Sequence, residues 1–159
     1  MAGPLVRRAV LGVSVAGLAL IAHFEGTRTT AYRDSVGVPT ICTGHTKHVR
    51  MQDRRTLGEC EQFLREDASE AGQAVSRLVT APMTQGQYDA LVSFTFNLGA
   101  GSLERSTLLR KFNSGDCYGA VREFPRWNRA GGEVLRGLTT RRQAEAAKFK
   151  EGCDAQSIT

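Results

Sequence analysis

The sequence has few of the residues that build a metal site. Only three histidines occur in 159 residues, and none of the four cysteines belongs to a pair separated by two residues. A structural zinc site usually needs four such ligands at close spacing. We therefore expect no metal ion. The four cysteines form either buried thiols or two disulfides, and disulfides would require an oxidising compartment.

The chain also lacks internal repeats, low-complexity segments and a dense block of basic residues. Its net charge of +5 and isoelectric point near 9.3 suit an anionic partner, such as nucleic acid, anionic lipid or a wall polymer. Because no nucleic-acid-binding signature is present, we expect no nucleic-acid partner. The length and a hydrophobic fraction of 41% predict one globular domain with a sizeable core.

Charge is missing from residues 9–22, "AVLGVSVAGLALIA", which follow Arg7 and Arg8. This segment could be a cleaved signal peptide, a buried first helix or a weakly hydrophobic membrane segment. Its short length favours a buried helix, whereas its lack of a polar face favours the membrane. Its glycines, alanines and serine would hold the bilayer poorly. We favour the membrane segment and keep the buried helix as the alternative.

The patterns that follow predict an α+β fold. Residues 31–46 predict a small hairpin, in which Pro39 marks an edge strand. Capping patterns at Thr56 and Thr84 predict the starts of two helices. Further helices are expected over residues 107–113, 117–127 and 138–149, and a loose tail over residues 154–159.

Two carboxylates and a threonine flank the hairpin, at Glu25, Asp34 and Thr40. Glu25 follows an apolar helix, and both a helix C-terminus and apolar surroundings disfavour a carboxylate anion. Asp34 lies at a turn beside Arg33 and is expected to stay ionised. Such a pair can share the acid and water-activating roles of glycoside hydrolysis, with Thr40 holding the water. Spacing alone does not establish this chemistry, because a helix-end residue and a turn former explain the same two acids.

The stretch "FEGTRTTAYRDSVGVPTICTGHT" is more specific than the spacing of its acids. It resembles the catalytic stretch of phage-type lysozymes, the endolysin muramidase family that includes the T4 and P22 enzymes. The stretches "QYDALVSFTFNLGAG", "STLLRKFNSGD" and "GLTTRRQAEAAKF" resemble the later helices of that family, so the resemblance covers residues 22–153. It implies a lysozyme-like fold, in which a small sheet lobe carries the acids and docks on a larger helical lobe.

The resemblance also implies roles for individual residues. Glu25 takes the place of the general acid, Asp34 that of the second carboxylate and Thr40 that of the active-site threonine. For His45 and Trp127 we expect structural roles, a hydrogen bond and core packing. Three positions fall where the helical lobe of the family faces the sugar chain and are candidate substrate-binding residues: Asn97, Gly99 and Gly101.

The N-terminal region resembles that of signal-anchor-release endolysins, the P21 type, in its arginine pair and its missing polar face. Those proteins wait in the inner membrane and are released to the periplasm on depolarisation. The resemblance implies an anchor over residues 1–24, a catalytic domain over residues 25–153 and a tail over residues 154–159. It also implies a holin or pinholin as functional partner, and we expect a monomer. Residues 1–24 contain no cysteine, so release of a membrane-held thiol cannot be the switch.

A periplasmic location would expose all four cysteines to oxidation. Cys42 lies on the hairpin and Cys60 at the start of the next helix, so the chain can fold back to join them. Cys117 starts one helix and Cys153 follows the last. We expect the pairs Cys42–Cys60 and Cys117–Cys153, while the two crossed connectivities and free thiols remain open.

With this resemblance, the sequence predicts an enzyme that hydrolyses the β-1,4 bond between N-acetylmuramic acid and N-acetylglucosamine in peptidoglycan without a cofactor, and the resemblance implies inversion. A lytic transglycosylase is the nearest alternative, but it can work with one acid and leaves Asp34 and Thr40 unexplained. A non-catalytic, membrane-anchored wall-binding protein would explain the apolar segment and the positive charge. It would give no reason for the three candidate catalytic residues.

Overall fold

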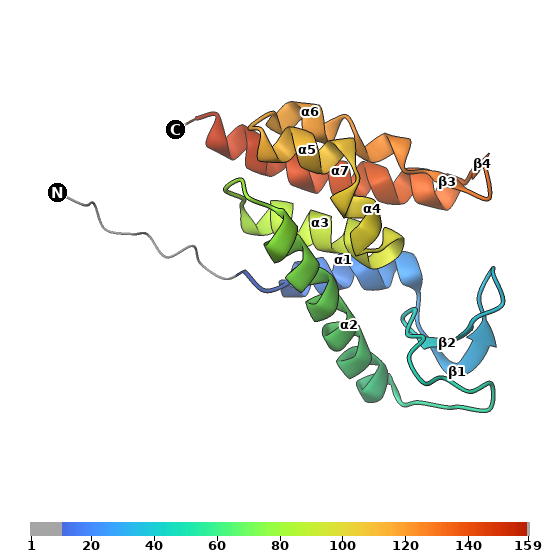
Figure 1. Cartoon of the computed structure of the whole chain (residues 1–159). Coiled ribbons are helices and arrows are strands. Elements are labelled where there is room, and N and C mark those ends of the chain that lie inside the picture. Colours follow the sequence, from blue (N-terminus) through green and yellow to red (C-terminus); the bar gives the residue numbers. More distant parts are fainter. Residues whose placement is uncertain (1–10, 159) are drawn as a thin grey trace.

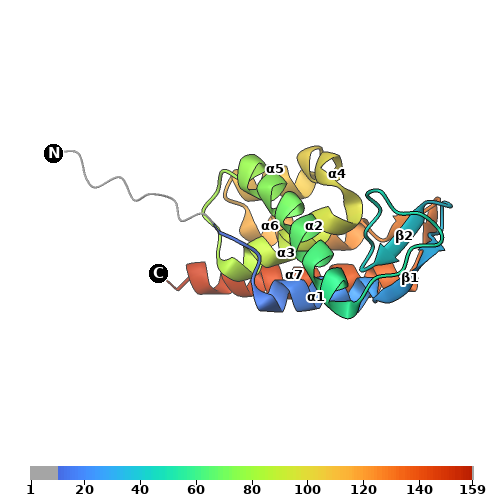
Figure 2. The ribbon, with the colours of Figure 1, turned by 90° about the horizontal axis from the view of Figure 1, so that it is seen from below.

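The computed structural model describes residues 11–158 and confirms the α+β fold. A small β lobe lies beside a larger helical lobe, and α2 (Leu57–Leu78) runs between them (Figures 1 and 2). Helix α1 (Val15–Glu25) leads directly into the β lobe. The end of α1 therefore lies where the two lobes meet.

The β lobe is built on the expected hairpin. Strands β1 (Arg28–Arg33) and β2 (Pro39–Cys42) pair antiparallel, with Tyr32 opposite Thr40. An irregularity in the register separates this pair from the pair of Arg28 with Cys42. The pairing brings the turn residues 34–38 and the second strand to one end of the molecule.

Both helix starts that the capping patterns predicted are confirmed. Thr56 and Glu59 form a reciprocal capping box at α2, and Thr84 and Gln87 form another at α3 (Gln85–Leu98). The rest of the helical lobe comprises α4 (Ala100–Glu104), α5 (Thr107–Asn113), α6 (Cys117–Val121), the 3-10 turn η1 (Phe124–Arg126), the short strands β3 (Arg129–Ala130) and β4 (Glu133–Val134), and α7 (Arg136–Gln156).

Two expectations about the C-terminal half differ from the structure. The helix predicted over residues 117–127 is divided into α6 and η1, because Pro125 lacks an N–H group and fits the first turn of a new element. The tail expected from residue 154 begins later, because α7 continues to Gln156. The side chain of Asp154 in this last turn accepts a hydrogen bond of 2.7 Å from the Tyr118 hydroxyl.

Helix α3 is the centre of the helical lobe and packs against α1, α2 and α7. Its residues 87–95 are all buried, so it contributes to the core on every side. The ring of Phe94 meets those of Phe124 and Trp127 edge to face, with centroids 5.8 and 5.4 Å apart. Trp127 thus packs against the core, as the sequence indicated.

Helix α1 is fastened to α3 by a buried carboxylate. Asp89 is 1% exposed and accepts hydrogen bonds from the backbone N–H and the hydroxyl of Ser14, and from Gln85. Ser14 also caps α1 by accepting the N–H of Gly17. No helix within residues 11–158 is both long and apolar enough to cross a membrane. The rest of the expected anchor, including Arg7 and Arg8, lies outside the described residues.

Two disulfides join Cys42 to Cys60 and Cys117 to Cys153, with Cα atoms 4.8 and 5.8 Å apart. These are the two pairs that the sequence favoured. The first ties the hairpin to the start of α2, and the second ties α6 to the last turns of α7.

Candidate active site

Glu25 is the last residue of α1, and its two carboxylate oxygens have different neighbours. Arg141 of α7 donates a hydrogen bond of 2.6 Å from Nη1 to Oε1. The other oxygen faces Gly44 in the loop after β2, where an added Cβ atom would lie 3.2 Å from Oε2. The sequence predicted apolar surroundings for Glu25. This was wrong, because the guanidinium group of Arg141, whose side chain is 4% exposed, lies against it.

This contact is the outer end of a row of four charged side chains that runs into the protein. We call this row the charge chain, and its order is Glu25, Arg141, Glu145, Arg142. Arg141 Nε lies 3.4 Å from Glu145 Oε2, and Arg142 Nε lies 2.7 Å from Glu145 Oε1. Glu145 and Arg142 are fully buried. The chain alternates in sign and is neutral when all four groups are ionised, which is the usual condition for burying charge.

Helix α3 supplies polar partners to the charge chain. The Ser93 hydroxyl donates to Glu145 Oε2 at 2.6 Å, and the Ser93 carbonyl accepts from Arg141 at 3.2 Å. Burial raises the pKa of the Glu145 carboxyl, whereas Arg142, Ser93 and Arg141 act to lower it. Burial likewise lowers the pKa of Arg142. The ionised form of Glu145 is the one that leaves neither buried guanidinium unbalanced.

Asn97 lies at the far end of the charge chain. Arg142 Nη2 donates to Asn97 Oδ1 at 2.8 Å, which assigns the carbonyl oxygen of that amide to Arg142. Asn97 also lines a hollow of about 320 Å³ together with Glu25 and Arg141. The Asn97 amide N–H groups are not used in this contact and remain available as donors.

Asp34 and Thr40 lie on the hairpin. Asp34 Oδ1 accepts the backbone N–H groups of Val36 and Val38, at 3.0 and 2.8 Å, and so closes the turn. Both hydrogen bonds are accepted by Oδ1. Within the described residues, Oδ2 therefore remains available to accept a hydrogen bond from another partner. Thr40 is 3% exposed, and its hydroxyl donates to the Val38 carbonyl at 2.9 Å. Its lone pairs remain able to accept a hydrogen bond.

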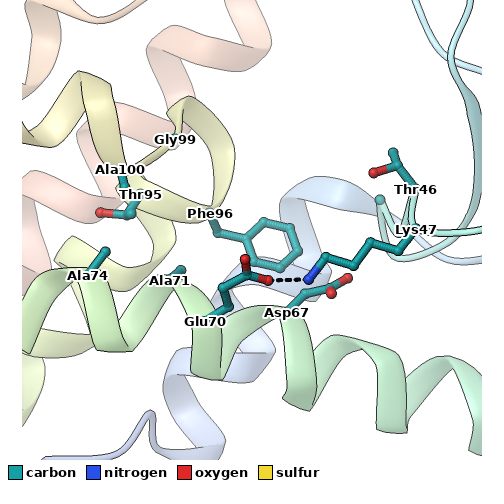
Figure 3. Close-up of a pocket in the computed structure, with 11 residues that line it drawn as sticks. Thr46, Lys47, Asp67, Glu70, Ala71, Ala74, Thr95, Phe96, Gly99 and Ala100 are labelled. Carbon is teal, nitrogen blue, oxygen red and sulfur yellow. Dashed lines mark hydrogen bonds and ion pairs between the residues drawn. The ribbon is translucent and has the colours of Figure 1, made fainter.

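A second hollow of about 280 Å³ lies between the lobes and is drawn in Figure 3. Gly44 and Phe96 belong to its wall, so it begins beside Glu25. Lys47 of the β lobe reaches across to Glu70 of α2, with which it forms an ion pair. Gly99 also lines this hollow, whereas Gly101 is exposed and lines neither of the two.

His45 has the structural environment that the sequence predicted. Its Nδ1 lies 2.7 Å from Asp67 of α2, and its ring stacks on Phe63 with centroids 4.3 Å apart. These contacts attach the loop that contains Gly44 to the first half of α2. Within residues 11–158, no group of three or more metal-ligating side chains gathers.

Arg141, Arg142 and Glu145 were not among the candidates that the sequence predicted. The signal was present in "RRQAE", where two adjacent arginines precede a glutamate by three and four residues on one helix. Such pairs are common on solvated helix faces. Only the packing of α7 against α3 shows that these two arginines and the glutamate are buried.

The phage lysozyme family model matches residues 22–145. An endolysin of Acyrthosiphon pisum secondary endosymbiont phage 1 is 42% identical over 142 residues, which span 87% of this chain and 97% of the relative. A SAR-endolysin of Enterobacteria phage P21 is 36% identical over 86% of this chain and 84% of its own length.

A solved structure adds a likeness of fold to these matches. The muramidase domain of SpmX from Asticaccaulis excentricus superposes with a TM-score of 0.81 and 38% identity, over 86% of this chain and 96% of that domain. The similarity includes both the β lobe and the helical lobe, because each match spans most of the described residues.

Proposed function

Because the chain belongs to the phage lysozyme family, we propose how its own residues carry out lysozyme chemistry. The protein is an endolysin that cleaves peptidoglycan. The observation that carries the assignment of its site is the placement of Glu25, between the two lobes and on the wall of a hollow.

Glu25 is the general acid in this proposal. Arg141 occupies Oε1, so the transferable proton is carried on Oε2, which faces Gly44, a residue in the wall of the 280 Å³ hollow between the lobes. This proton passes to the glycosidic oxygen between N-acetylmuramic acid and N-acetylglucosamine as the bond to the anomeric carbon breaks.

Asp34 and Thr40 prepare the water that replaces the leaving sugar. Water gives a proton to Asp34 Oδ2 while its oxygen attacks the anomeric carbon from the opposite face, which inverts the configuration. The Thr40 hydroxyl, already donating to Val38, accepts a hydrogen bond from the same water and orients it. An inverting enzyme needs about 6.5–9.5 Å between its carboxyl groups to hold this water.

The glycan passes Asn97, Gly99 and Gly101 on the helical lobe, where Asn97 and Gly99 each line one of the two hollows and Gly101 is exposed in α4 beyond them. With its carbonyl oxygen held by Arg142, Asn97 offers N–H donors that suit a hydroxyl or acetamido oxygen of the sugar. Because the two glycines have no side chain, the glycan can approach the protein backbone closely at these positions. The positive net charge of +5 helps the enzyme to gather on an anionic wall.

Residues 1–24 form a releasable inner-membrane anchor, and the residues from 25 to the end of α7 form the catalytic part that works in the periplasm. The SAR-endolysin relatives and the uncharged segment over residues 9–22 support this division. The α1 helix docked on α3 is then the released form. The protein acts as a monomer, and a holin or pinholin triggers its release.

The assignment of the acid is tested by Glu25→Gln in a turbidity assay on permeabilised Gram-negative cells. The amide cannot donate the proton, so we expect lysis to be lost while circular dichroism and thermal stability are kept. Glu133→Gln, on the exposed strand β4, is the matched control and should lyse normally. Lysis by folded Glu25→Gln would overturn the assignment.

Product masses separate hydrolysis from the transglycosylase reaction. Hydrolysis adds one water to each cleaved bond, whereas a transglycosylase leaves an anhydro sugar that is lighter by one water. Wild-type protein should release the hydrated product. Release of no sugar fragments would favour the non-catalytic wall-binding protein.

A further inference from the structure

We infer that Glu145 is a positioning residue that orients the proposed acid through Arg141 and the proposed sugar-binding amide of Asn97 through Arg142. The inference rests on the function proposed for Glu25. It concerns a side chain that touches neither the hollow nor the substrate, because Glu145 is fully buried between α7 and α3.

The first arm of the argument runs to Glu25. Arg141 Nη1 holds Glu25 Oε1, and the rest of the guanidinium is fixed by Ser93 and by Glu145. A long arginine side chain has many rotamers, so one contact at its tip does not set its position. The Arg141 guanidinium lies between two carboxylates, with Glu25 on its outer side and the buried Glu145 on its inner side.

The second arm runs to Asn97. The Arg142 guanidinium contacts both Glu145 oxygens and donates to Asn97 Oδ1. This donation decides which end of the Asn97 amide faces the hollow. Without Glu145, Arg142 loses its ion-pair partner, and the amide loses the support that keeps its N–H groups toward the sugar.

The charges of the four groups make the inference testable by pH. The charged groups that face Glu145 are Arg141 and Arg142 on its own helix and, beyond Arg141, Glu25 on α1. Helix α3 faces it with the uncharged hydroxyl of Ser93. With Glu25 ionised, replacing the Glu145 carboxylate by an amide changes the charge chain from neutral to +1, and a surplus cation beside a general acid opposes its protonation.

The experiment compares three variants of the full chain in the lysis assay across pH, with kcat and KM measured on soluble glycan fragments. Glu145→Gln removes one charge, Arg142→Gln/Glu145→Gln removes a balanced pair, and Glu145→Asp keeps the charge but shortens its reach. The matched control is Glu123→Gln, a carboxylate that is 4% exposed and paired with Lys111 and Arg126 outside the charge chain.

We expect Glu145→Gln to move the alkaline limb of kcat/KM to lower pH by about one unit and to lower kcat about 10- to 100-fold. The limb should return to its wild-type position in the double variant and in Glu145→Asp, whereas Glu123→Gln should not move it. The double variant should also show a raised KM, because Asn97 is no longer held.

A merely structural role would lower thermal stability in every variant and leave the alkaline limb in place. Folded Glu145→Gln with a wild-type limb and kcat would therefore overturn the inference. If that variant does not fold, the neutral double variant decides, and wild-type kcat and KM there would also overturn it. Lysis by Glu25→Gln would instead refute the proposed acid, so the two failures are distinguishable.

Discussion

At the scale of single residues, Gly44 limits what can stand beside Glu25. Its φ of +80° lies in the left-handed region, and a Cβ atom there would approach Glu25 Oε2. The loop that carries Gly44 is held in place by His45 and Asp67. The glycine is therefore needed both for its backbone conformation and for the space that it leaves.

Gly44→Ala should lower kcat about 10- to 100-fold, because the methyl group displaces the carboxylate that donates the proton. Gly132→Ala is the matched control. Its φ is +81°, so it carries a similar backbone strain of about 1–2 kcal/mol, but no atom lies within 4 Å of the added Cβ. Equal losses of kcat in the two variants would assign the whole effect to strain.

Asp34 combines a turn-forming role with its proposed chemical role, and substitution can separate them. Asp34→Asn keeps an oxygen that accepts the N–H groups of Val36 and Val38, but it cannot take a proton from water. We expect the stability of the fold to be kept and kcat to fall about 10²- to 10⁴-fold. Stability is read from thermal melts. Full lysis by Asp34→Asn would remove Asp34 from the mechanism.

The sequence indicated Glu25, Asp34 and Thr40 because all three lie within one short stretch with a recognisable order. It did not indicate Arg141, which contacts Glu25 across 116 positions of the chain. A local pattern carries no information about which distant arginine a half-buried carboxylate will meet. The apolar environment expected for Glu25 was wrong for the same reason.

At the scale of elements, α1 carries the question of membrane anchoring. Gly17 packs against Asp89, where an added Cβ atom would lie 2.7 Å from the carboxylate carbon. Gly12 has open space around it. A larger side chain is therefore compatible with the docked helix at residue 12 and incompatible with it at residue 17.

Gly12→Leu should raise the fraction of protein in the inner membrane before lysis and delay lysis, because it makes the segment more hydrophobic. It should leave the urea midpoint of the released protein unchanged. Gly17→Leu should lower that midpoint, so its lysis phenotype cannot be read as retention alone. Recovery of both variants entirely in the cytoplasm before lysis would favour the buried-helix alternative.

Helix starts were the most predictable elements. The capping boxes at Thr56 and Thr84 use side chains three residues apart, so the sequence contains the whole motif. The division between α6 and η1 and the extension of α7 depend on packing. Cys153, which the sequence placed after the last helix, lies within α7 because it is buried and bonded to Cys117.

At the scale of the molecule, the two disulfides hold different parts. Cys42–Cys60 ties the hairpin that carries Asp34 and Thr40 to α2, whereas Cys117–Cys153 lies within the helical lobe. Each bridge should contribute about 2–4 kcal/mol to the free energy of unfolding. Their loss should nevertheless have different consequences for catalysis.

Cys117→Ser/Cys153→Ser should lower the urea midpoint and leave kcat near the wild-type value in the folded protein. Cys42→Ser/Cys60→Ser should lower both, because the hairpin loses its covalent attachment beside the site. Unfolding curves and kcat are measured on the oxidised proteins. A wild-type kcat in the second variant would show that the hairpin is positioned without its bridge.

The neutrality of the charge chain has a consequence for how this enzyme can diversify. When all four groups are ionised, the two carboxylates of the charge chain balance its two guanidinium groups, so the net charge of +5 resides on other side chains. Exposed charges are screened by salt over about 10 Å, whereas buried pairs are screened much less. Substitutions can therefore change the number and sign of surface charges, to suit a different wall or salinity, while the charges that surround the proposed proton donor Glu25 stay the same. Binding to the wall and catalysis can therefore change independently of each other within one small domain.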